Sequence, residues 1–513
     1  MSVAPHTPLP LRELGEVPLT LDELLAIGRG ELRVSLGAAG RERVRRGADL
    51  LAAALLSEAP IYGVTTGVGD SVTTAIAASM ADRFPLNLLR FHGCGVGPKL
   101  TGTEAATVVA VRLASLSRGY GGVREVVVDR LCQLLALRLL PRIPGLGSVG
   151  ASGDLTPLSY LAALLVGERE ATLRGELMSA AEAHAAVGLE PLTLLPKESL
   201  AIMNGTSVLT ALGCLAWERA RYLARLVAAI TAGLSDVVRG NAEHFSARIF
   251  ELKPHPGLVK AAAWIREDIE LEARKQTSLG RLQDRYSIRC APHVIGVLVD
   301  AVAQLEQTLF IEANSINDNP ILDPDTGSIL HGGNFYAGHA GFALDALKVA
   351  VANVADLLDR QLVLLCDGSV NGGLPTNLVA APFPESTIHH GFKAVSIAAS
   401  ALTAEALKLT VPASIFSRSA EAHNQDKVPM ASIAARDSLA ILDLTENVAA
   451  MALLAVCQGF DLRAGEHCHG RLTALWRTIR EHIPTVEADR PMDGDLELVV
   501  SLIRDRRLPV GDL

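Results

Sequence analysis

Helical periodicity constrains the fold of this 513-residue chain more than any other feature. Apolar residues recur every three or four positions in three long stretches, 212–230, 344–365 and 433–457. This spacing places the apolar side chains on one face of an α-helix, and that face needs a partner surface to cover it. Alternating strand patterns are few and short. The sequence therefore predicts a mainly α-helical protein with a bundle of long, alanine-rich helices in its middle and C-terminal parts.

The segments between the predicted helices are rich in glycine and asparagine. They lie at 62–69, 91–97, 145–153, 203–206, 317–320 and 331–335. Loops held by a rigid scaffold are where chemistry usually takes place, so we expect the functional residues there. On this basis we divide the chain into a loop-rich N-terminal catalytic region, 1–205, and a region of long and C-terminal helices, 206–513.

Composition argues against several classes of protein. The chain has 47 basic and 56 acidic side chains, a net charge of −9, which gives no general attraction for nucleic acid. Its seven cysteines are odd in number and widely spaced, as expected of free thiols in a reducing compartment. The sequence shows no secretory signal pattern and no uncharged apolar run of membrane-spanning length. We therefore expect a soluble, cytoplasmic protein with neither nucleic acid nor membrane as partner.

Residues 151–153, Ala-Ser-Gly, indicate the most specific chemistry in the chain. The amide nitrogen of Gly153 can attack the carbonyl carbon of Ala151, because glycine has no side chain to block the approach. Loss of water closes a five-membered ring, and loss of the Ser152 hydroxyl leaves an exocyclic methylene conjugated with it. The product is an electrophile made from backbone, for chemistry that otherwise needs an electron-sink cofactor such as pyridoxal phosphate. Taken alone, the same tripeptide is also a common tight turn.

Three other interpretations are weaker. The glycines within 145–150 match the dinucleotide-binding spacing, but prolines precede them and no helix start follows directly. Ser152 lies one residue short of a hydrolase nucleophile elbow, and no parallel-sheet pattern surrounds it. Residues 467–469, His-Cys-His, would rarely close a metal site unaided. We therefore expect neither a nucleotide nor a metal.

Seven short segments, in order along the chain, resemble the aromatic amino acid ammonia-lyase and aminomutase family, most closely its phenylalanine and tyrosine type. They are Tyr62-Gly-Val-Thr-Thr-Gly-Val-Gly, Gly150-Ala-Ser-Gly-Asp-Leu-Thr-Pro-Leu-Ser, Met203-Asn-Gly-Thr, Gln283-Asp-Arg-Tyr-Ser-Ile-Arg289, Asn317-Asp-Asn-Pro, His331-Gly-Gly-Asn-Phe and His423-Asn-Gln-Asp426. The similarity runs from about Leu21 to the C-terminus.

This resemblance implies a fold, an assembly and a prosthetic group. The fold would be an α-helical homotetramer in which loops of three subunits assemble each active site. The prosthetic group would be 4-methylidene-imidazol-5-one, formed autocatalytically from Ala151, Ser152 and Gly153 with the assistance of Asp154. No metal and no diffusible cofactor would be required.

The resemblance also assigns three catalytic or clamping side chains. Tyr62 would be the base that removes the β-hydrogen of the substrate, which requires nearby dipoles or the electrophile to lower its phenol pKa. Arg289 would clamp the substrate carboxylate, because a guanidinium offers two parallel donors to two oxygens. Tyr286, three residues earlier, lies on the same side if this segment is helical, and would assist at the reacting centre.

Five further side chains are expected at the substrate. The amides of Gln283 and Asn204 would bond the electrophile's oxygen or the substrate's carboxylate and amine, and the sequence does not separate this role from loop-stabilising hydrogen bonds. Phe335 would pack against the substrate or the prosthetic group, with Asn334 beside it. Glu421 would lie near the substrate amine, as a glutamate does in phenylalanine-type members of the family.

Three positions bear on the side chain of the substrate. Gln425 stands where histidine-specific members have a glutamate, and a neutral amide suits an uncharged ring. Phe91 provides an apolar wall, and His92 offers a polar partner at the far end of the ring. Phenylalanine would leave His92 unpaired, which costs about 1–3 kcal/mol for a buried polar group, whereas tyrosine would satisfy it.

We therefore expect an ammonia-lyase that converts an aromatic L-amino acid, tyrosine in preference to phenylalanine, into the trans-arylacrylate (coumarate or cinnamate) and ammonia. A 2,3-aminomutase is the first alternative, because it uses the same residues. Histidine ammonia-lyase is the next alternative, which His92 supports and Gln425 opposes. An inactive helical scaffold is the last, and the presence of Tyr62, Ser152, Tyr286 and Arg289 speaks against it.

Overall fold

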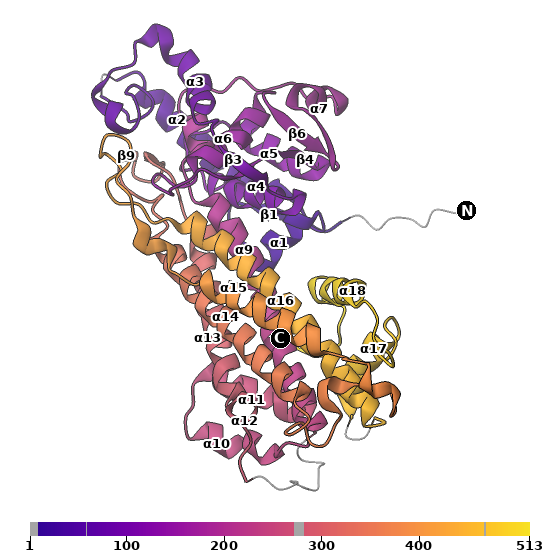
Figure 1. Ribbon diagram of the computed structural model, residues 1–513. Coiled ribbons are helices and arrows are strands. Elements are labelled where there is room, and N and C mark those ends of the chain that lie inside the picture. Colours follow the sequence, from indigo (N-terminus) through magenta and orange to yellow (C-terminus); the bar gives the residue numbers. More distant parts are fainter. Residues whose placement is uncertain (1–8, 58, 271–281, 466–467) are drawn as a thin grey trace. The chain divides into compact units, whose positions relative to one another are not determined.

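The structure is a computed structural model that describes residues 9–57, 59–270, 282–465 and 468–513 (Figure 1). Helices dominate it. They are α1 (Leu21–Arg29), α2 (Ala38–Ala54), α3 (Phe84–Phe91), α4 (Gly102–Leu116), α5 (Glu125–Leu137), α6 (Leu155–Leu165), α7 (Ala180–Ala186), α8 (Glu198–Met203), α9 (Ser207–Val237), α10 (Ala247–Glu251), α11 (Pro256–Asp268), α12 (Tyr286–Arg289), α13 (Ala291–Ala313), α14 (Gly338–Cys366), α15 (Lys393–Lys408), α16 (Ala431–Leu462), α17 (Gly470–Arg480) and α18 (Asp493–Arg504).

The three periodic stretches of the sequence are long helices, as predicted. The stretch 212–230 lies within α9, 344–365 within α14, and 433–457 within α16. Each helix extends beyond the periodic stretch by a few residues at one or both ends, because the terminal turns do not need the apolar repeat. The prediction of a mainly α-helical protein is confirmed.

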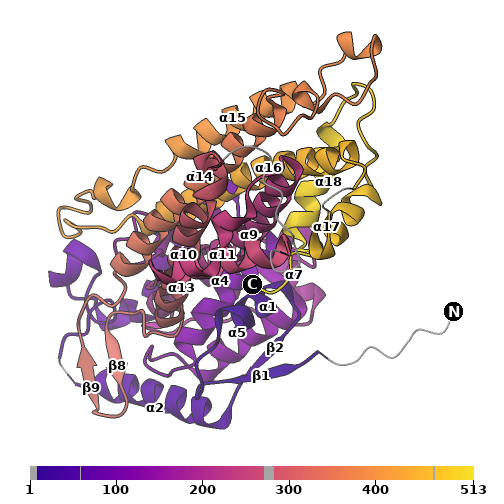
Figure 2. The same ribbon diagram turned by 90° about the horizontal axis from the view of Figure 1, so that it is seen from below.

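The strands are short and form four small sheets. They are β1 (Leu11–Leu14), β2 (Arg33–Leu36), β3 (Val96–Lys99), β4 (Leu139–Pro141), β5 (Pro144–Leu146), β6 (Glu170–Leu173), β7 (Glu176–Ser179), β8 (Ile321–Asp323) and β9 (Ser328–Leu330). β1 pairs in parallel with β2, whereas β3–β5, β4–β6–β7 and β8–β9 are antiparallel. Figure 2 shows the β8–β9 hairpin beside α2, which β8 contacts.

The chain separates into two compact units, each made of three segments. The first unit comprises Met1–Leu215, Glu306–Leu344 and Pro412–Arg436, and the second comprises Ala216–Leu305, Asp345–Val411 and Asp437–Leu513. The division expected from the sequence, at 205/206, is continuous and therefore differs from this one. The difference arises because α9, α13, α14 and α16 each contribute residues to both units.

The core of the first unit is built around α4, in which every residue from Ala105 to Leu116 is buried. A capping box, in which Thr101 and Glu104 bond each other's backbone amides, fixes the start of this helix. α1 crosses α4 closely, since a Cβ on Gly28 would lie 2.1 Å from Oγ1 of Thr107. α8, which ends next to the Asn204 loop, packs against α3 and α6 in the same unit.

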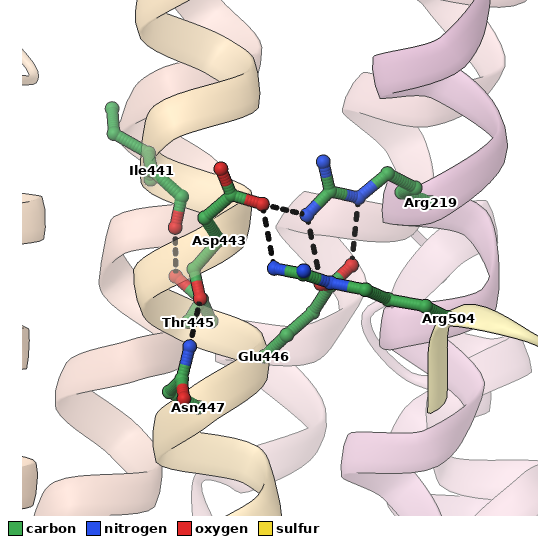
Figure 3. A network of polar contacts seen from close by, with 7 residues as sticks. All are labelled: Arg219, Ile441, Asp443, Thr445, Glu446, Asn447 and Arg504. Carbon is green, nitrogen blue, oxygen red and sulfur yellow. Dashed lines mark hydrogen bonds and ion pairs between the residues drawn. The ribbon is translucent and has the colours of Figure 1, made fainter. Parts of the chain in front are cut away.

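An ionic network ties three helices of the second unit together (Figure 3). Glu446 of α16 accepts hydrogen bonds from Arg219 of α9, at 2.7 and 2.8 Å, and from Arg504 of α18, at 2.9 Å. Asp443, one helical turn earlier, accepts from the same two guanidinium groups at 2.6 and 2.7 Å. The network therefore joins α9 to two helices that start more than 200 residues later in the sequence.

Two apolar helical stretches are long enough to cross a membrane by length and composition alone. They are residues 286–313, whose most apolar part is 33% buried, and α16, whose most apolar part is 72% buried. Both contain acidic residues, including Asp300 in the first and Glu446 in the second. The burial of α16 is that of a core helix in a globular protein.

Candidate active site

A cavity of the first unit gathers most of the loops that the sequence singled out. It encloses about 490 Å³, part of it open to solvent, which is within the range of small-molecule sites. Its lining residues are Tyr62, Val68, Gly69, Leu88, Phe91, His92, Ser152, Leu155, Leu200, Asn204, Asn319, Phe335, Glu421 and Gln425. Loops from all three segments of the unit therefore meet at one place.

The 151–153 segment lies at the cavity in a conformation that only glycine permits at its last residue. Gly153 has φ +69°, and a Cβ there would lie 2.2 Å from the carbonyl oxygen of Gly205. Ala151 is buried, and Ser152 reaches the cavity. Two backbone layers thus pack directly on each other at Gly153 and Gly205, and this close packing suits a segment in which two backbone atoms must approach.

Asp154, immediately after this segment, is fully buried and well bonded. Its Oδ2 accepts hydrogen bonds from the backbone amides of Val208 and Leu209 at 3.1 and 2.9 Å, and its Oδ1 accepts from Ser148 at 3.2 Å. Burial raises the pKa of Asp154 to about 6, although these donors oppose the rise. This carboxyl can therefore accept or release a proton near neutral pH, one residue from the candidate electrophile.

Asn204 bonds the backbone of the candidate electrophile. Its Nδ2 donates to the carbonyl oxygen of Ser152 at 2.7 Å. Its Oδ1 is buried and has no hydrogen-bond partner among the residues that the structure describes. The sequence left open whether this amide stabilises a loop or bonds the reacting groups, and the structure places it on Ser152.

The phenol oxygen of Tyr62 accepts a hydrogen bond from a glycine amide. The backbone amide of Gly69 donates to the Tyr62 oxygen at 2.8 Å. Burial raises the pKa of Tyr62 above its ordinary value, the Gly69 bond opposes this rise, and the Glu421 charge adds to it. The sequence predicted that a base at this position needs a lowered pKa. Within this unit the Gly69 dipole acts in that direction, but burial outweighs it.

Glu421 lies at a strained turn next to Tyr62. Three consecutive residues, Glu421 to His423, have positive φ values of 50°, 52° and 66°, although none is glycine. The Glu421 carboxylate accepts from the backbone amide of Asp70 at 2.7 Å and from Nδ2 of Asn424 at 2.9 Å. A Cβ on Gly69 would lie 2.0 Å from this carboxylate, so only glycine fits there. The turn therefore fixes a negative charge close to the phenol.

The end of the cavity at Phe91 and His92, where the sequence places the substrate ring as an expectation, combines apolar walls with one imidazole. The rings of Phe91 and His92 lie 4.0 Å apart, centroid to centroid, with their planes tilted by 35°. Nδ1 of His92 is 2.9 Å from the Leu88 carbonyl oxygen, which can only accept, so Nδ1 carries the hydrogen. Burial lowers the pKa of His92, which keeps the ring neutral at pH 7. Its Nε2 is then a hydrogen-bond acceptor.

Four of the side chains expected at the substrate or the reacting centre do not line this cavity. Asn334 belongs to the first unit, where its Nδ2 donates to the Ile316 carbonyl at 3.4 Å. Gln283, Tyr286 and Arg289 belong to the second unit. There α12 forms a helical turn, which is the condition under which Tyr286 and Arg289 were expected to lie on the same side.

Within α12, the Arg289 guanidinium lies 4.6 Å from the centroid of the Tyr286 ring. Tyr286 is 71% exposed. Nε of Arg289 has no hydrogen-bond partner in the described part of the chain. This pair therefore presents an exposed phenol and a buried, unpaired guanidinium nitrogen.

Several lining residues escaped the sequence analysis. Leu88, Leu155 and Leu200 supply apolar wall from helices, where a leucine gives no sign of facing a cavity rather than the core. Asn319 lies in a segment that the sequence singled out, but its role there was not assigned. Among the described lining residues the only carboxylate is Glu421, and none is a lysine or an arginine. An α-amino acid's carboxylate therefore finds no cationic partner in this lining.

Comparisons with known proteins agree with this arrangement. Residues 19–481 match the model of the family described as aromatic amino acid lyase. The histidine ammonia-lyase of Burkholderia vietnamiensis is 37% identical over 490 residues, which cover 95% of this chain and 96% of that protein. The crystal structure of tyrosine aminomutase from Streptomyces globisporus has a TM-score of 0.91 at 32% identity and covers 98% of both chains. Phenylalanine aminomutase from Pantoea agglomerans has a TM-score of 0.90 at 29% identity and covers 96% of this chain and 99% of its own.

Proposed function

Because the chain belongs to the aromatic amino acid lyase family, and is thus a carbon–nitrogen lyase, we propose that it eliminates ammonia from an aromatic L-amino acid and prefers tyrosine. The products are ammonia and the trans-arylacrylate, coumarate from tyrosine and cinnamate from phenylalanine. The observation that carries the preference is the tautomer of His92, whose Nδ1 is committed to Leu88 and whose Nε2 is left to accept.

We propose that the chain forms its own 4-methylidene-imidazol-5-one from Ala151, Ser152 and Gly153. Three observations fit this group: the glycine-only conformation of Gly153, the fully buried Asp154 beside it, and the Asn204 amide on the Ser152 carbonyl. When formed, the group supplies an electrophile that makes the substrate amine a better leaving group. Asn204 would hold the segment in place, and Asp154 would exchange protons while it forms.

The proton that leaves the substrate's β-carbon would go to the Tyr62 oxygen. The Gly69 amide already donates to this atom and so stabilises the phenolate. Burial and Glu421 act against ionisation, so the base needs positive charge from outside this lining. The family resemblance places Arg289 at the substrate carboxylate. Its guanidinium would therefore be the cationic partner that the cavity lining lacks.

The substrate ring would lie between the leucine side chains and Phe91, with its far end at His92. A tyrosine hydroxyl can donate to Nε2 of His92, whereas a phenylalanine ring leaves that acceptor unpaired. The neutral Gln425 amide lines the same cavity and suits an uncharged ring. This end of the cavity would thus offer a phenol apolar walls and one hydrogen-bond acceptor.

We propose a homotetramer in which three subunits contribute to each active site. Two features of single chains support this assembly. Arg289 and Tyr286 lie in the second unit rather than in the cavity lining, and Tyr286 is largely exposed. Large apolar side chains are also exposed, including Ile311 at 66%, Phe342 at 66% and Ile397 at 65%, and contact with other subunits would cover such side chains.

The test is a substrate panel that compares the wild-type chain with His92→Leu. L-Tyrosine, L-phenylalanine and L-histidine are incubated separately, and the absorbance of each conjugated acid gives kcat/KM. We expect tyrosine to be the best substrate of the wild type. His92→Leu should lower the tyrosine-to-phenylalanine ratio about 5- to 150-fold, since an unpaired buried hydroxyl costs about 1–3 kcal/mol.

Cys94→Ala is the matched control, because Cys94 is exposed, lies two residues from His92 and does not line the cavity. It should leave the ratio unchanged. An unchanged ratio in His92→Leu would remove the basis for the tyrosine preference. No acid product from either tyrosine or phenylalanine would refute the proposed activity.

Two alternatives have specific support. Histidine ammonia-lyase is favoured by the identity to the Burkholderia enzyme, and urocanate formation faster than coumarate formation would establish it. A 2,3-aminomutase is favoured by the two aminomutase structures, and chromatographic detection of a β-amino acid would establish it. The same incubations therefore decide among all three activities.

A further inference from the structure

Three charged side chains are buried together behind the candidate active site. Arg112 of α4, Lys197 before α8 and Asp318 are each no more than 2% exposed. Nζ of Lys197 lies 2.7 Å from Oδ2 of Asp318. Burial lowers the pKa of Arg112 to about 10 and also lowers the pKa of Lys197, while the nearby Asp318 opposes both shifts. A buried group of this kind is costly and needs a reason.

Arg112 braces the loop that packs on the candidate electrophile. Its Nη1 donates to the carbonyl oxygens of Asn204 and Asn317, at 3.1 Å each. A Cβ on Gly205 would lie 1.9 Å from the same nitrogen. Gly205 is thus held between Arg112 on one side and Gly153 on the other. The Arg112 guanidinium therefore supports the backbone of residues 204 and 205 from the side opposite Gly153.

Lys197 and Asp318 fix the two chain segments that reach the cavity. Lys197 is the N-cap of α8 and has φ +80°, an unfavourable value for a residue with a side chain. At the other end, α8 is capped by Asn204, whose carbonyl oxygen accepts the Arg112 hydrogen bond. Both ends of α8 are therefore anchored. Asp318 also accepts from the backbone amide of Asn319 at 2.7 Å, and Asn319 lines the cavity.

We propose that Arg112, Lys197 and Asp318 are positioning residues that brace Gly205 against Gly153 during ring closure and hold Asn204 on Ser152. This inference rests on the proposed prosthetic group. In ring closure the Gly153 nitrogen bonds the Ala151 carbonyl carbon, and that carbonyl oxygen leaves as water with the amide hydrogens of Gly153 and Ser152, so that a C=N bond joins the Ala151 carbon and the Ser152 nitrogen. Ser152 then loses its hydroxyl and its α-hydrogen as a second water, so no oxidant is needed. None of the three charged side chains touches the reacting atoms.

The three charges suggest which variants will still fold. The group sets two basic side chains against one carboxyl, so Arg112→Met leaves the Lys197–Asp318 pair, and Lys197→Met leaves Arg112 with Asp318. Asp318→Leu would instead remove the carboxyl that both basic side chains face and is expected to unfold the protein. The two methionine variants are therefore the informative ones.

The test measures ring formation by intact mass rather than by activity alone. The mature wild-type chain should be lighter than its sequence mass by two waters, roughly 36 Da. In Arg112→Met we expect the fraction of dehydrated chains to fall, and its rate of increase after synthesis to slow about 10- to 100-fold, as for other small misplacements of reacting groups. The kcat per dehydrated chain should also fall, and Arg112→Lys should recover part of both.

Arg130→Met is the matched control. Arg130 is 8% exposed, lies on α5 and donates to the carbonyl of Glu190, away from the cavity. It should lower the midpoint of thermal unfolding by an amount similar to that in Arg112→Met, yet leave complete dehydration and the wild-type kcat. A purely structural role for Arg112 would make the two variants alike in all measurements.

The outcomes separate the two proposals. A wild-type chain without the mass deficit would refute the proposed prosthetic group itself. A wild type with the deficit, together with a folded Arg112→Met that is fully dehydrated and has unchanged kcat, would overturn the positioning role. If Arg112→Met does not give soluble, helical protein, Lys197→Met takes its place with the same expected and opposing results.

Discussion

Asp154 shows how burial prepares a single side chain for chemistry. The protein encloses this carboxyl completely, and its pKa rises to about 6 because the charged form loses its water. Two backbone amides and Ser148 compensate only in part. The folded protein therefore prefers the neutral acid, whereas an unfolded chain ionises it near pH 4.

This preference predicts a specific pH dependence of stability. Because the folded pKa lies above the unfolded one, the contribution of Asp154 is complete below about pH 4 and is lost as the pH rises through 6. Between pH 5 and pH 8 we expect the wild type to lose roughly 1–2 kcal/mol relative to Asp154→Asn, which has no carboxyl to titrate there. Urea unfolding of both proteins at the two pH values measures this difference.

The comparison needs a second carboxyl as reference. Asp129→Asn changes a carboxylate that pairs with Arg41 and is 36% exposed in its side chain, and it keeps Asp154, so it should lose stability between pH 5 and pH 8 as the wild type does. A constant difference between the wild type and Asp154→Asn across this range would contradict the raised pKa.

At the scale of residues, the sequence predicted those side chains whose role is indicated by their neighbours in the chain. Ser152, Tyr62 and His92 were found because each stands in a distinctive short segment, and the structure brings them to one cavity. Arg112 and Lys197 gave no such signal. Their partners lie far away in the chain, 92 and 205 residues for Arg112 and 121 for Lys197, and a basic residue in a helical pattern is normally expected at the surface.

At the scale of elements, the network around Glu446 holds α9, α16 and α18 together (Figure 3). Its two acids differ in environment. The Glu446 side chain is 2% exposed, whereas that of Asp443 is 54% exposed, although both bind the same arginines. Removing a charge from a buried group costs far more than removing one from water.

We therefore predict unequal effects of two isosteric changes. Glu446→Gln should lower the free energy of unfolding by about 3–5 kcal/mol, because Arg219 and Arg504 lose their buried counter-charge. Asp443→Asn should cost no more than about 1 kcal/mol. Chemical denaturation of both variants measures the difference, and equal losses would show that Glu446 is not the centre of the network.

Helices were easier to predict than strands for a physical reason. The apolar repeat of α9, α14 and α16 is written along the chain and requires no knowledge of the partner surface. A strand such as β1 or β5 has only three or four residues and exists because a distant strand pairs with it. So short a segment shows too few alternations to be recognised from its own sequence.

At the scale of the whole molecule, the proposed assembly predicts complementation between inactive chains. Ser152→Ala would remove the proposed electrophile, and Arg289→Met would remove the proposed carboxylate clamp. Each variant alone should lose at least about 100-fold in kcat/KM. Co-expressed in equal amounts with different affinity tags, mixed oligomers should recover about a quarter of the wild-type activity, because half of the subunits supply each intact part.

The mixed oligomers are isolated by sequential affinity steps on the two tags. Tagged wild-type chains, co-expressed in the same way, give the reference activity. Mixed oligomers with no more activity than the separate variants would mean that Ser152 and Arg289 of one chain serve the same site, which would contradict the shared assembly.

Two kinds of packing meet at the cavity. Gly153 and Gly205, which follow the lining residues Ser152 and Asn204, pack backbone against backbone with no space for a Cβ, whereas Phe91, His92 and Gln425 form a second surface that lines the cavity itself. A mutant library for a new aromatic substrate should therefore randomise the second surface alone. Substitutions at Gly153 and Gly205 would mostly yield chains that do not become active, however well they bind the substrate.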